Sequence, residues 1–424
     1  MVPSAQTAAN ETKPVTFRLS EDWTVVVLGF LNILLILWGL TVPAAKLNWT
    51  SPGDLAGQVL TTDYLYLLFI HFFLTFFVFL LGNRIMGKPL KGVLLSFPFI
   101  FLLTHVAVIL AGHRWAGDLN LEAVIFSLVI GLMVNNLFRL PAWFKSTLNS
   151  ELMVKVGLVI LGTSIIFSDI LKAGLLGVLQ SVIVVVSVWY FSFWICRWLR
   201  LDKELSLMLS SAVSICGVSA AIATAGAIQG DNRKLSFVIS LVLVTAIPMM
   251  IFMPAIAGYL GLPEAVTGAW LGGSIDTTGA VVASGTLVGE EALKISTIVK
   301  FSQNVLLGIA ALGISVYWSY TQTTTDERPS LNSIWERFPK FILGFLLASL
   351  LFSFVISSQT LADVKGSLKT AQNLWFVLAF TSIGLETRFS DIFNADSRKP
   401  LLAFLLAQGF NILITLLLAY LLFS

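Results

Sequence analysis

Long apolar runs separated by short polar connections extend from residue 23 to residue 423. Most of these runs are long enough to cross a membrane, since a spanning helix needs about 17–25 apolar residues. They fall near 23–45, 63–82, 90–112, 121–138, 152–170, 173–198, 235–258, 291–318, 335–357, 370–387 and 399–423. The pattern predicts an all-α membrane protein, a polytopic helical bundle with no soluble domain.

Two further apolar segments, 205–230 and 263–287, are interrupted by similar motifs. Ser214–Gly217 reads Ser-Ile-Cys-Gly and Ser274–Thr277 reads Ser-Ile-Asp-Thr, and a run rich in Ala and Val follows each motif. A break in a helix at membrane depth survives only where protein or a water-filled cavity satisfies the backbone. Paired interruptions of this kind point to the binding site of a secondary transporter.

Basic residues gather in the loops around 84–91, 139–155 and 197–203, whereas the loops between them hold few. Because cytoplasmic loops carry an excess of Lys and Arg, this bias predicts a cytoplasmic N-terminus for a multi-pass protein of the bacterial inner membrane. Residues 1–22 are polar and lack the apolar stretch of a signal peptide, so they are interpreted as a cytoplasmic tail.

The same rule applies to the interrupted segments. If 205–230 crossed the membrane, Arg233 and Lys234 would lie outside, whereas a segment that returns keeps them cytoplasmic. The charges therefore favour two re-entrant helical hairpins that enter from opposite faces, with 235–258 crossing between them. A crossing helix with an unwound centre is the alternative.

A second internal similarity supports inverted repeats. Gly162–Ile170 and Gly384–Ile392 both end in Phe-Ser-Asp-Ile, and the predicted topology runs their helices in opposite directions. The sequence thus divides into extra N-terminal transmembrane helices over 23–112 and a transporter core over 121–424.

Composition narrows the partners. Of 424 residues, 57% are hydrophobic and 12% charged, against about 25% charged in soluble proteins. A dispersed net charge of +3 argues against nucleic acid, which leaves a small-molecule solute and membrane lipid as partners, with a homo-oligomer left open. No histidine or cysteine has metal-ligand spacing and no catalytic motif appears, so neither a cofactor nor an enzyme is expected.

The first motif predicts an anion site made from backbone. If a helix starts at Val218, the N–H groups of its first turn lack partners and carry partial positive charge. Close packing through small residues is the alternative. The candidate solute-binding residues of the two motifs are Ser214, Cys216, Gly217, Val218, Ser219, Ser274, Thr277, Thr278 and Gly279.

Asp276 is the candidate for ion coupling. A carboxylate at mid-membrane depth is costly unless paired or hydrated, so such residues are functional by default. The hydroxyls of Ser274 and Thr277 beside it suit Na⁺, and a desolvated carboxyl equally suits H⁺. A carboxylate that only caps the following helix is the alternative.

Lys300, Gln303 and Asn304 fall early in the run 291–318. Lys300 and Asn304 share an i, i+4 face, so the amides are further candidates for solute binding and Lys300 for a charge partner. Lys300 could instead extend to the membrane interface. Glu386 and Arg388 are interpreted as a solvated pair at a helix end.

From about Phe126 onward the chain resembles the YeiH-type (UPF0324) family of bacterial membrane transporters, described as sulfate exporters. The motifs that carry the resemblance are Gly131–Asn135, Gly157–Gly162, Ser214–Gly217, Gly273–Ser274, Val281–Gly285, Ile298–Lys300 and Ser382–Leu385. The resemblance implies a secondary carrier built from inverted repeats.

The chain departs from the family pattern at charged positions. Asp276-Thr277 stands in place of His-Glu, Ala225 in place of Glu, and Ser164 and Gln303 in place of Arg. Two fewer cations weaken the case for a dianion such as sulfate. The sequence therefore predicts a secondary active transporter of a small anionic solute, sulfate- or sulfonate-like by resemblance, coupled to Na⁺ or H⁺. An ion channel or a cation/proton antiporter is the alternative.

Overall fold

The computed structural model describes residues 18–118, 122–321, 335, 338–387 and 398–424. Over these residues the regular structure is helical apart from one isolated bridge between Trp49 and His113. The helices are α1 (Glu21–Leu37), α2 (Pro52–Val59), α3 (Thr62–Ile85), α4 (Leu90–Ala111), α5 (Arg114–Asp118), α6 (Ala123–Leu137), α7 (Ala142–Lys145), α8 (Ser150–Leu161), η1 (Gly162–Ser164), α9 (Phe167–Trp198), α10 (Lys203–Ser211), η2 (Ala212–Cys216), α11 (Val218–Ile228), α12 (Asn232–Tyr259), α13 (Glu264–Ser274), α14 (Thr278–Val288), α15 (Glu290–Thr321), α17 (Phe341–Phe354), α18 (Ser358–Glu386) and α19 (Arg398–Phe423). The predicted all-α class is confirmed.

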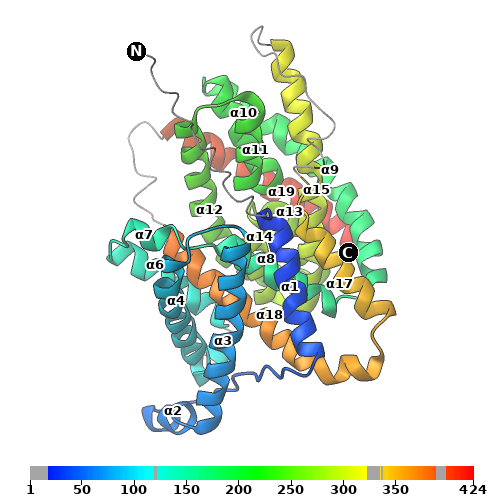
Figure 1. Cartoon of the computed structure of the whole chain (residues 1–424). Helices are drawn as coiled ribbons and strands as arrows, with labels where there is room; N and C mark the ends of the chain where they lie inside the picture. Colours follow the sequence, from blue (N-terminus) through cyan, green and yellow to red (C-terminus); the bar gives the residue numbers. More distant parts are fainter. Residues whose placement is uncertain (1–17, 119–121, 322–334, 336–337, 388–397) are drawn as a thin grey trace, which may run out of the picture.

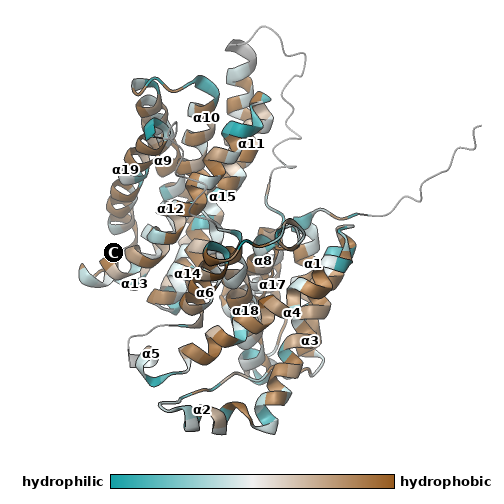
Figure 2. Ribbon diagram, turned by 90° about the vertical axis from the view of Figure 1, so that its left-hand side faces the viewer, coloured by the Kyte–Doolittle hydropathy of each residue, from teal (hydrophilic) through white to brown (hydrophobic). Residues whose placement is uncertain are grey.

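Six described helices are long and apolar enough to cross a membrane, namely α3, α4, α9, α12, α15 and α19. Apolar residues cover most of the ribbon in Figure 2, including its outer helices. Large exposed side chains such as Phe69, Trp194 and Leu413 fit a lipid-facing surface. A multi-pass membrane protein follows.

The helices form two groups (Figures 1 and 2). The first, here called the hairpin bundle, comprises α9–α15 and α19. The second, the flanking bundle, comprises α1, α3, α4, α6, α8, α17 and α18. Helix α14 joins the groups, since it packs against α12 and α15 on one side and α8 and α18 on the other.

One predicted span has different bounds. The run 152–170 is not one helix, because α8 ends at Leu161 and α9 begins at Phe167. The hydroxyls of Thr163 and Ser164 donate to the carbonyls of Ile160 and Leu161, each at 2.8 Å, and so complete the last turn of α8.

Some predictions concern residues that the structure does not describe. The motif Gly384–Ile392, which resembles Gly162–Ile170, lies partly outside the described residues, as do residues 1–17 of the predicted tail and Arg388. Inverted repeats stay a prediction.

Hairpin one, formed by α10, η2 and α11, returns to the end at which it began. Lys234, just after the hairpin, forms ion pairs with Asp202 at 2.9 Å and Glu204 at 3.1 Å, just before and at its start. The alternative of a crossing helix over 205–230 is therefore wrong.

Hairpin two, formed by α13 and α14, also closes on itself. A methyl group placed on Gly289, which follows α14, would lie 2.6 Å from Oε2 of Glu264, where α13 starts. Between the two hairpins runs α12, whose 28 residues rise about 42 Å. The hairpins thus enter from opposite ends of a membrane-length helix, as predicted.

The tips of the hairpins meet. Their arms contain nine to eleven residues, or about 14–17 Å, which is half of a hydrocarbon core of about 30 Å. A methyl group on Gly217 would lie 3.1 Å from the main-chain oxygen of Asp276, so the two tips touch. The breaks in both segments therefore lie at middle depth.

Candidate functional site

A cavity of about 200 Å³ lies where the hairpin tips face the flanking bundle. Its wall contains the starts of α11 and α14 from the hairpins and parts of α1, α8 and α18 from the flanking bundle. The predicted site residues that line it are Cys216, Val218, Ser219, Thr277, Thr278, Gly279 and Asn304. The structure thus brings both motifs to one cavity, and it places the other candidates behind the tips.

The start of α11 depends on Gly217. This residue has φ +61° and ψ −111°, a conformation that side chains disfavour, and a methyl group there would approach Val242 Cγ1 to 2.6 Å. Helix α11 then begins at Val218 without a side-chain cap. The first turn of α11 therefore presents uncapped backbone at Val218 and Ser219 to the cavity.

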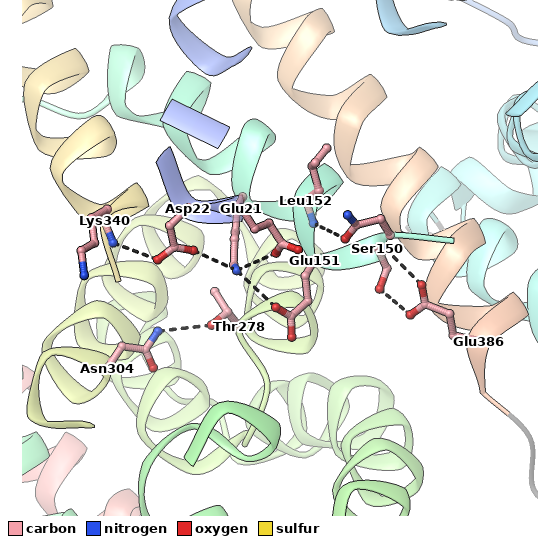
Figure 3. Close-up of polar contacts among 11 residues, drawn as sticks. Glu21, Asp22, Ser150, Glu151, Leu152, Thr278, Asn304, Lys340 and Glu386 are labelled. Carbon is pink, nitrogen blue, oxygen red and sulfur yellow. Dashed lines mark hydrogen bonds and ion pairs between the residues drawn. The ribbon is translucent and has the colours of Figure 1, made fainter. Parts of the chain in front are cut away.

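The start of α14 is capped and braced. The Thr277 hydroxyl accepts a hydrogen bond from the N–H of Ala280 at 3.3 Å. Asn304 Nδ2 donates to Thr278 Oγ1 at 3.3 Å, a contact drawn in Figure 3. Asn304 Oδ1 is buried and has no hydrogen-bond partner. An acceptor without a partner at a cavity wall is available to a bound solute.

Lys300 and Gln303 hold the backs of the tips. Lys300 Nζ donates to the carbonyl of Ile215 at 3.0 Å and to Gln303 Oε1 at 2.7 Å. Gln303 Nε2 donates to the carbonyls of Ser214 at 2.9 Å and Gly273 at 3.3 Å. These contacts satisfy carbonyls that the helix breaks leave open. Lys300 is 1% exposed, so the alternative that it extends to the membrane interface is wrong.

Two amides on α19 complete this support, and the sequence interpretation missed them. Gln408 Nε2 donates to the carbonyl of Ser274 at 2.8 Å. Asn411 Nδ2 donates to the same carbonyl at 3.1 Å and to that of Val213 at 3.2 Å. Two amides three residues apart within the apolar run 399–423 were the available signal, because polar side chains in a membrane helix require partners.

Asp276 lies at the contact between the tips. Its side chain is 2% exposed, and its Oδ2 has no hydrogen-bond partner. Ser274 Oγ is also buried without a partner. Among the ion pairs of the described residues, none includes Asp276. Thr277 is the N-cap of α14, so the alternative that Asp276 serves as this cap is wrong.

An acidic group from the flanking bundle faces the tips. Lys155 Nζ forms ion pairs with Glu21 at 3.0 Å, Asp22 at 3.1 Å and Glu151 at 3.2 Å. Figure 3 labels these three acidic residues. Asp22, Glu151 and Lys155 line the cavity. Because α1 and α8 are more than a hundred residues apart in sequence, no local pattern could have indicated this cluster.

Glu386 has hydrogen-bond partners that the sequence did not indicate. Its carboxylate accepts hydrogen bonds from the N–H of Ser150 at 3.1 Å and from the Ser150 hydroxyl at 2.5 Å. It therefore joins the end of α18 to the start of α8 and lines the cavity. Glu386 is exposed, and Arg388 lies outside the described residues, so the solvated pair stays a prediction. At the same end of α18, Asn135 of α6 donates to the carbonyl of Thr387 at 2.9 Å.

Paired hairpins, touching tips and a cavity at middle depth define a polytopic helical membrane protein of transporter-like architecture. A family model described as Conserved hypothetical protein 698 matches residues 91–403. A UPF0324 membrane protein of Rhodopirellula baltica is 38% identical over 82% of this chain and 66% of that relative. One of Nitratidesulfovibrio vulgaris is 37% identical over 81% of this chain and 62% of the relative. The chain belongs to the UPF0324 family of membrane proteins, as its motifs indicated.

The chain spans about two thirds of the length of these two relatives. It is also 29% identical to a UPF0324 membrane protein of Corynebacterium glutamicum, over 74% of this chain and 89% of the relative. Among solved structures, the sodium proton antiporter MjNhaP1 from Methanocaldococcus jannaschii matches 78% of this chain at 10% identity. The TM-score of that match is 0.20, so it carries no argument here.

Proposed function

We propose that this protein is a secondary active transporter of a small solute that carries an anionic group. The observation that carries the proposal is the convergence of two helix starts, from hairpins that enter at opposite ends, on one cavity at middle depth. This arrangement gives a single site that could be reached from either side of the membrane in turn.

The helix starts support an anionic group on the solute. The backbone N–H groups at the first turns of α11 and α14 carry partial positive charge, and Val218, Ser219, Thr278 and Gly279 place these turns at the cavity wall. Among the described residues that line the cavity, Lys155 is the only Lys or Arg. A single negative charge therefore fits this site better than the double charge of sulfate.

Asp276 supports coupling to a cation. Asp276 has a buried carboxylate oxygen without a partner, and Ser274, two residues before it, has a buried hydroxyl without a partner. Such oxygens suit Na⁺, and a buried carboxylate equally suits H⁺. Because Asp276 adjoins the start of α14, a cation bound there would change the electrostatic potential at the solute site. Solute and cation would then stabilise each other.

The test is transport by the full-length protein in proteoliposomes. Small monoanions are first screened by thermal shift with and without Na⁺, since a ligand of the folded state raises the melting temperature. We expect uptake of the stabilising anion to saturate and to accelerate with an inward Na⁺ or H⁺ gradient. Flux that neither saturates nor responds to the counter-ion gradient would instead identify a channel.

Asp276→Asn tests the coupling role separately. The amide keeps the size of the side chain but cannot change charge or balance a cation. We expect an unchanged melting temperature in the absence of ligands and the loss of all gradient dependence. Uptake with the wild-type response to Na⁺ and pH would remove Asp276 from the mechanism.

A further inference from the structure

The cavity differs in charge at its two ends. One end consists of the starts of α11 and α14, which carry partial positive charge. The other end contains three carboxylates, those of Asp22, Glu151 and Glu386, against the single ammonium of Lys155. Figure 3 shows the acidic group beside Thr278 and Asn304, which belong to the other end.

Lys155 does not neutralise the acidic end. Its ammonium is shared among Asp22, Glu151 and Glu21, the last of which lies outside the cavity lining. Glu386 is bound to neutral donors of Ser150 and has no cation within ion-pair distance among the described residues. The acidic end therefore keeps a surplus of negative charge.

A buried polar atom at the positive end indicates a ligand there. Asn304 is 4% exposed, lines the cavity and has an Oδ1 without a hydrogen-bond partner. An unsatisfied buried acceptor costs about 1–3 kcal/mol. A hydrogen-bond donor of the solute would supply the missing partner. The buried amide oxygen of Asn304 is therefore evidence for a ligand site that is independent of the helix starts.

Much of the remaining lining of the cavity is apolar. This part is made by residues of α8, α12 and α18, namely Val154, Leu243, Ala246, Ile247, Met250 and Phe380. Such a wall accommodates a short hydrocarbon segment, while the charged groups of the solute take the two ends.

We propose that the transported solute is a small zwitterion, with its anionic group at the starts of α11 and α14 and an ammonium group at the carboxylates of Asp22 and Glu151. This inference rests on the proposed function, because the anionic end is the same site. A simple anion would be repelled by the carboxylates, which outnumber the ammonium groups of the lining. A simple cation would face the positive helix starts.

Glu151 is the carboxylate most available to the ammonium group. Its side chain is 53% exposed and has one ion-pair partner, Lys155. Asp22 accepts an additional hydrogen bond from the N–H of Lys340 at 2.9 Å, and both oxygens of Glu386 are bound to Ser150. Glu21 is a matched control, because it pairs with Lys155 at 3.0 Å but does not line the cavity.

The test is binding of three matched series to the purified full-length protein. The series are ω-amino acids, carboxylic acids and primary amines, each with three to six carbons. We expect the best amino acid to bind about tenfold more tightly than the acid or the amine of equal length. This difference is about what one additional hydrogen bond to a charged group contributes. Glu151→Gln should lower amino acid affinity about fivefold to tenfold and leave acid affinity unchanged, whereas Glu21→Gln should preserve the preference.

The outcomes separate this inference from the proposed function. Acids that bind as tightly as amino acids would overturn the zwitterion while leaving the anion site intact. No binding by any series would also overturn it, and saturable uptake of another anion would then still support the transporter. Amines that bind best would overturn both. If Glu151→Gln fails to fold, the wild-type ranking of the three series decides the question by itself.

Discussion

Hairpin one and hairpin two have similar sequences but turn by different means. In hairpin one, the π-helical turn η2 and the positive φ of Gly217 redirect the chain, and no side chain caps α11. In hairpin two, extended backbone at Ile275 leads into α14, which Thr277 caps, and Asp276 lies at the tip. The motifs Ser-Ile-Cys-Gly and Ser-Ile-Asp-Thr differ in only two positions.

That difference gives the two helix starts different electrostatic properties. A helix start without a side-chain cap leaves its N–H groups to a ligand, as at Val218. A capped start beside a carboxylate is less attractive to an anion but can hold a cation. We therefore expect the two turns to respond differently to substitution, and the following experiments test this difference.

The largest expected effect is an all-or-none difference in labelling. Cysteine is placed after each hairpin, at Asn232→Cys and separately at Glu291→Cys, in a background with Cys196→Ser and Cys216→Ser. Because α12 separates the two bases, a membrane-impermeant maleimide should label one from the cytoplasmic side only and the other from outside only. The Lys/Arg bias predicts that residue 232 is the one labelled from the cytoplasmic side. Labelling of both from the same side would contradict opposed hairpins.

The next effect concerns the turn of hairpin one. Gly217→Ala should destabilise the protein by about 1–3 kcal/mol, since alanine is strained at this φ and ψ, and its methyl group would meet Val242 at 2.6 Å. Solute binding should be lost, because the start of α11 would shift.

The matched control for Gly217→Ala is Gly226→Ala in the same hairpin, where a methyl group meets nothing within 4 Å. It should be neutral or stabilising by up to about 1 kcal/mol. Thermal melts and ligand binding measure both, and normal affinity in Gly217→Ala would place the site elsewhere.

The sequence was informative where the signal is local. Apolar run lengths predicted the helices, charge bias predicted the hairpins, and small and hydroxyl residues predicted the tips. It was uninformative where partners are distant, as for Asp22 with Lys155 and Ser150 with Glu386, because no local pattern encodes which loops meet. Lys300 was found on the same helix as Asn304, but the direction in which each side chain points depends on how α15 packs.

The next prediction concerns the side chains that hold the two hairpin tips and compares their contributions to stability. Gln303 donates to one carbonyl in each tip, whereas Gln408 donates to a carbonyl of hairpin two only. Gln303→Ala should lower the free energy of unfolding by about 1–3 kcal/mol for each carbonyl left without a partner. Gln408→Ala should cost less, because Asn411 still donates to Ser274. Melting temperatures in one detergent compare the two variants. If the two variants lost equal stability, the idea that Gln303 supports both tips and Gln408 only one would be contradicted.

The smallest effect concerns the caps. Thr277→Val keeps the shape of the side chain but removes the hydroxyl that accepts from the N–H of Ala280. Stability should fall by about 1 kcal/mol, the typical cost of a lost N-cap. Ser219→Ala is the counterpart in hairpin one, where no side chain caps the helix, so it should leave the melting temperature unchanged and weaken solute binding instead. Melts and binding of the same two proteins test this crossed pattern. If Ser219→Ala lowered stability as much as Thr277→Val, the hydroxyl of Ser219 would stabilise its helix as a cap does, and the difference between a capped and an uncapped helix start would be contradicted.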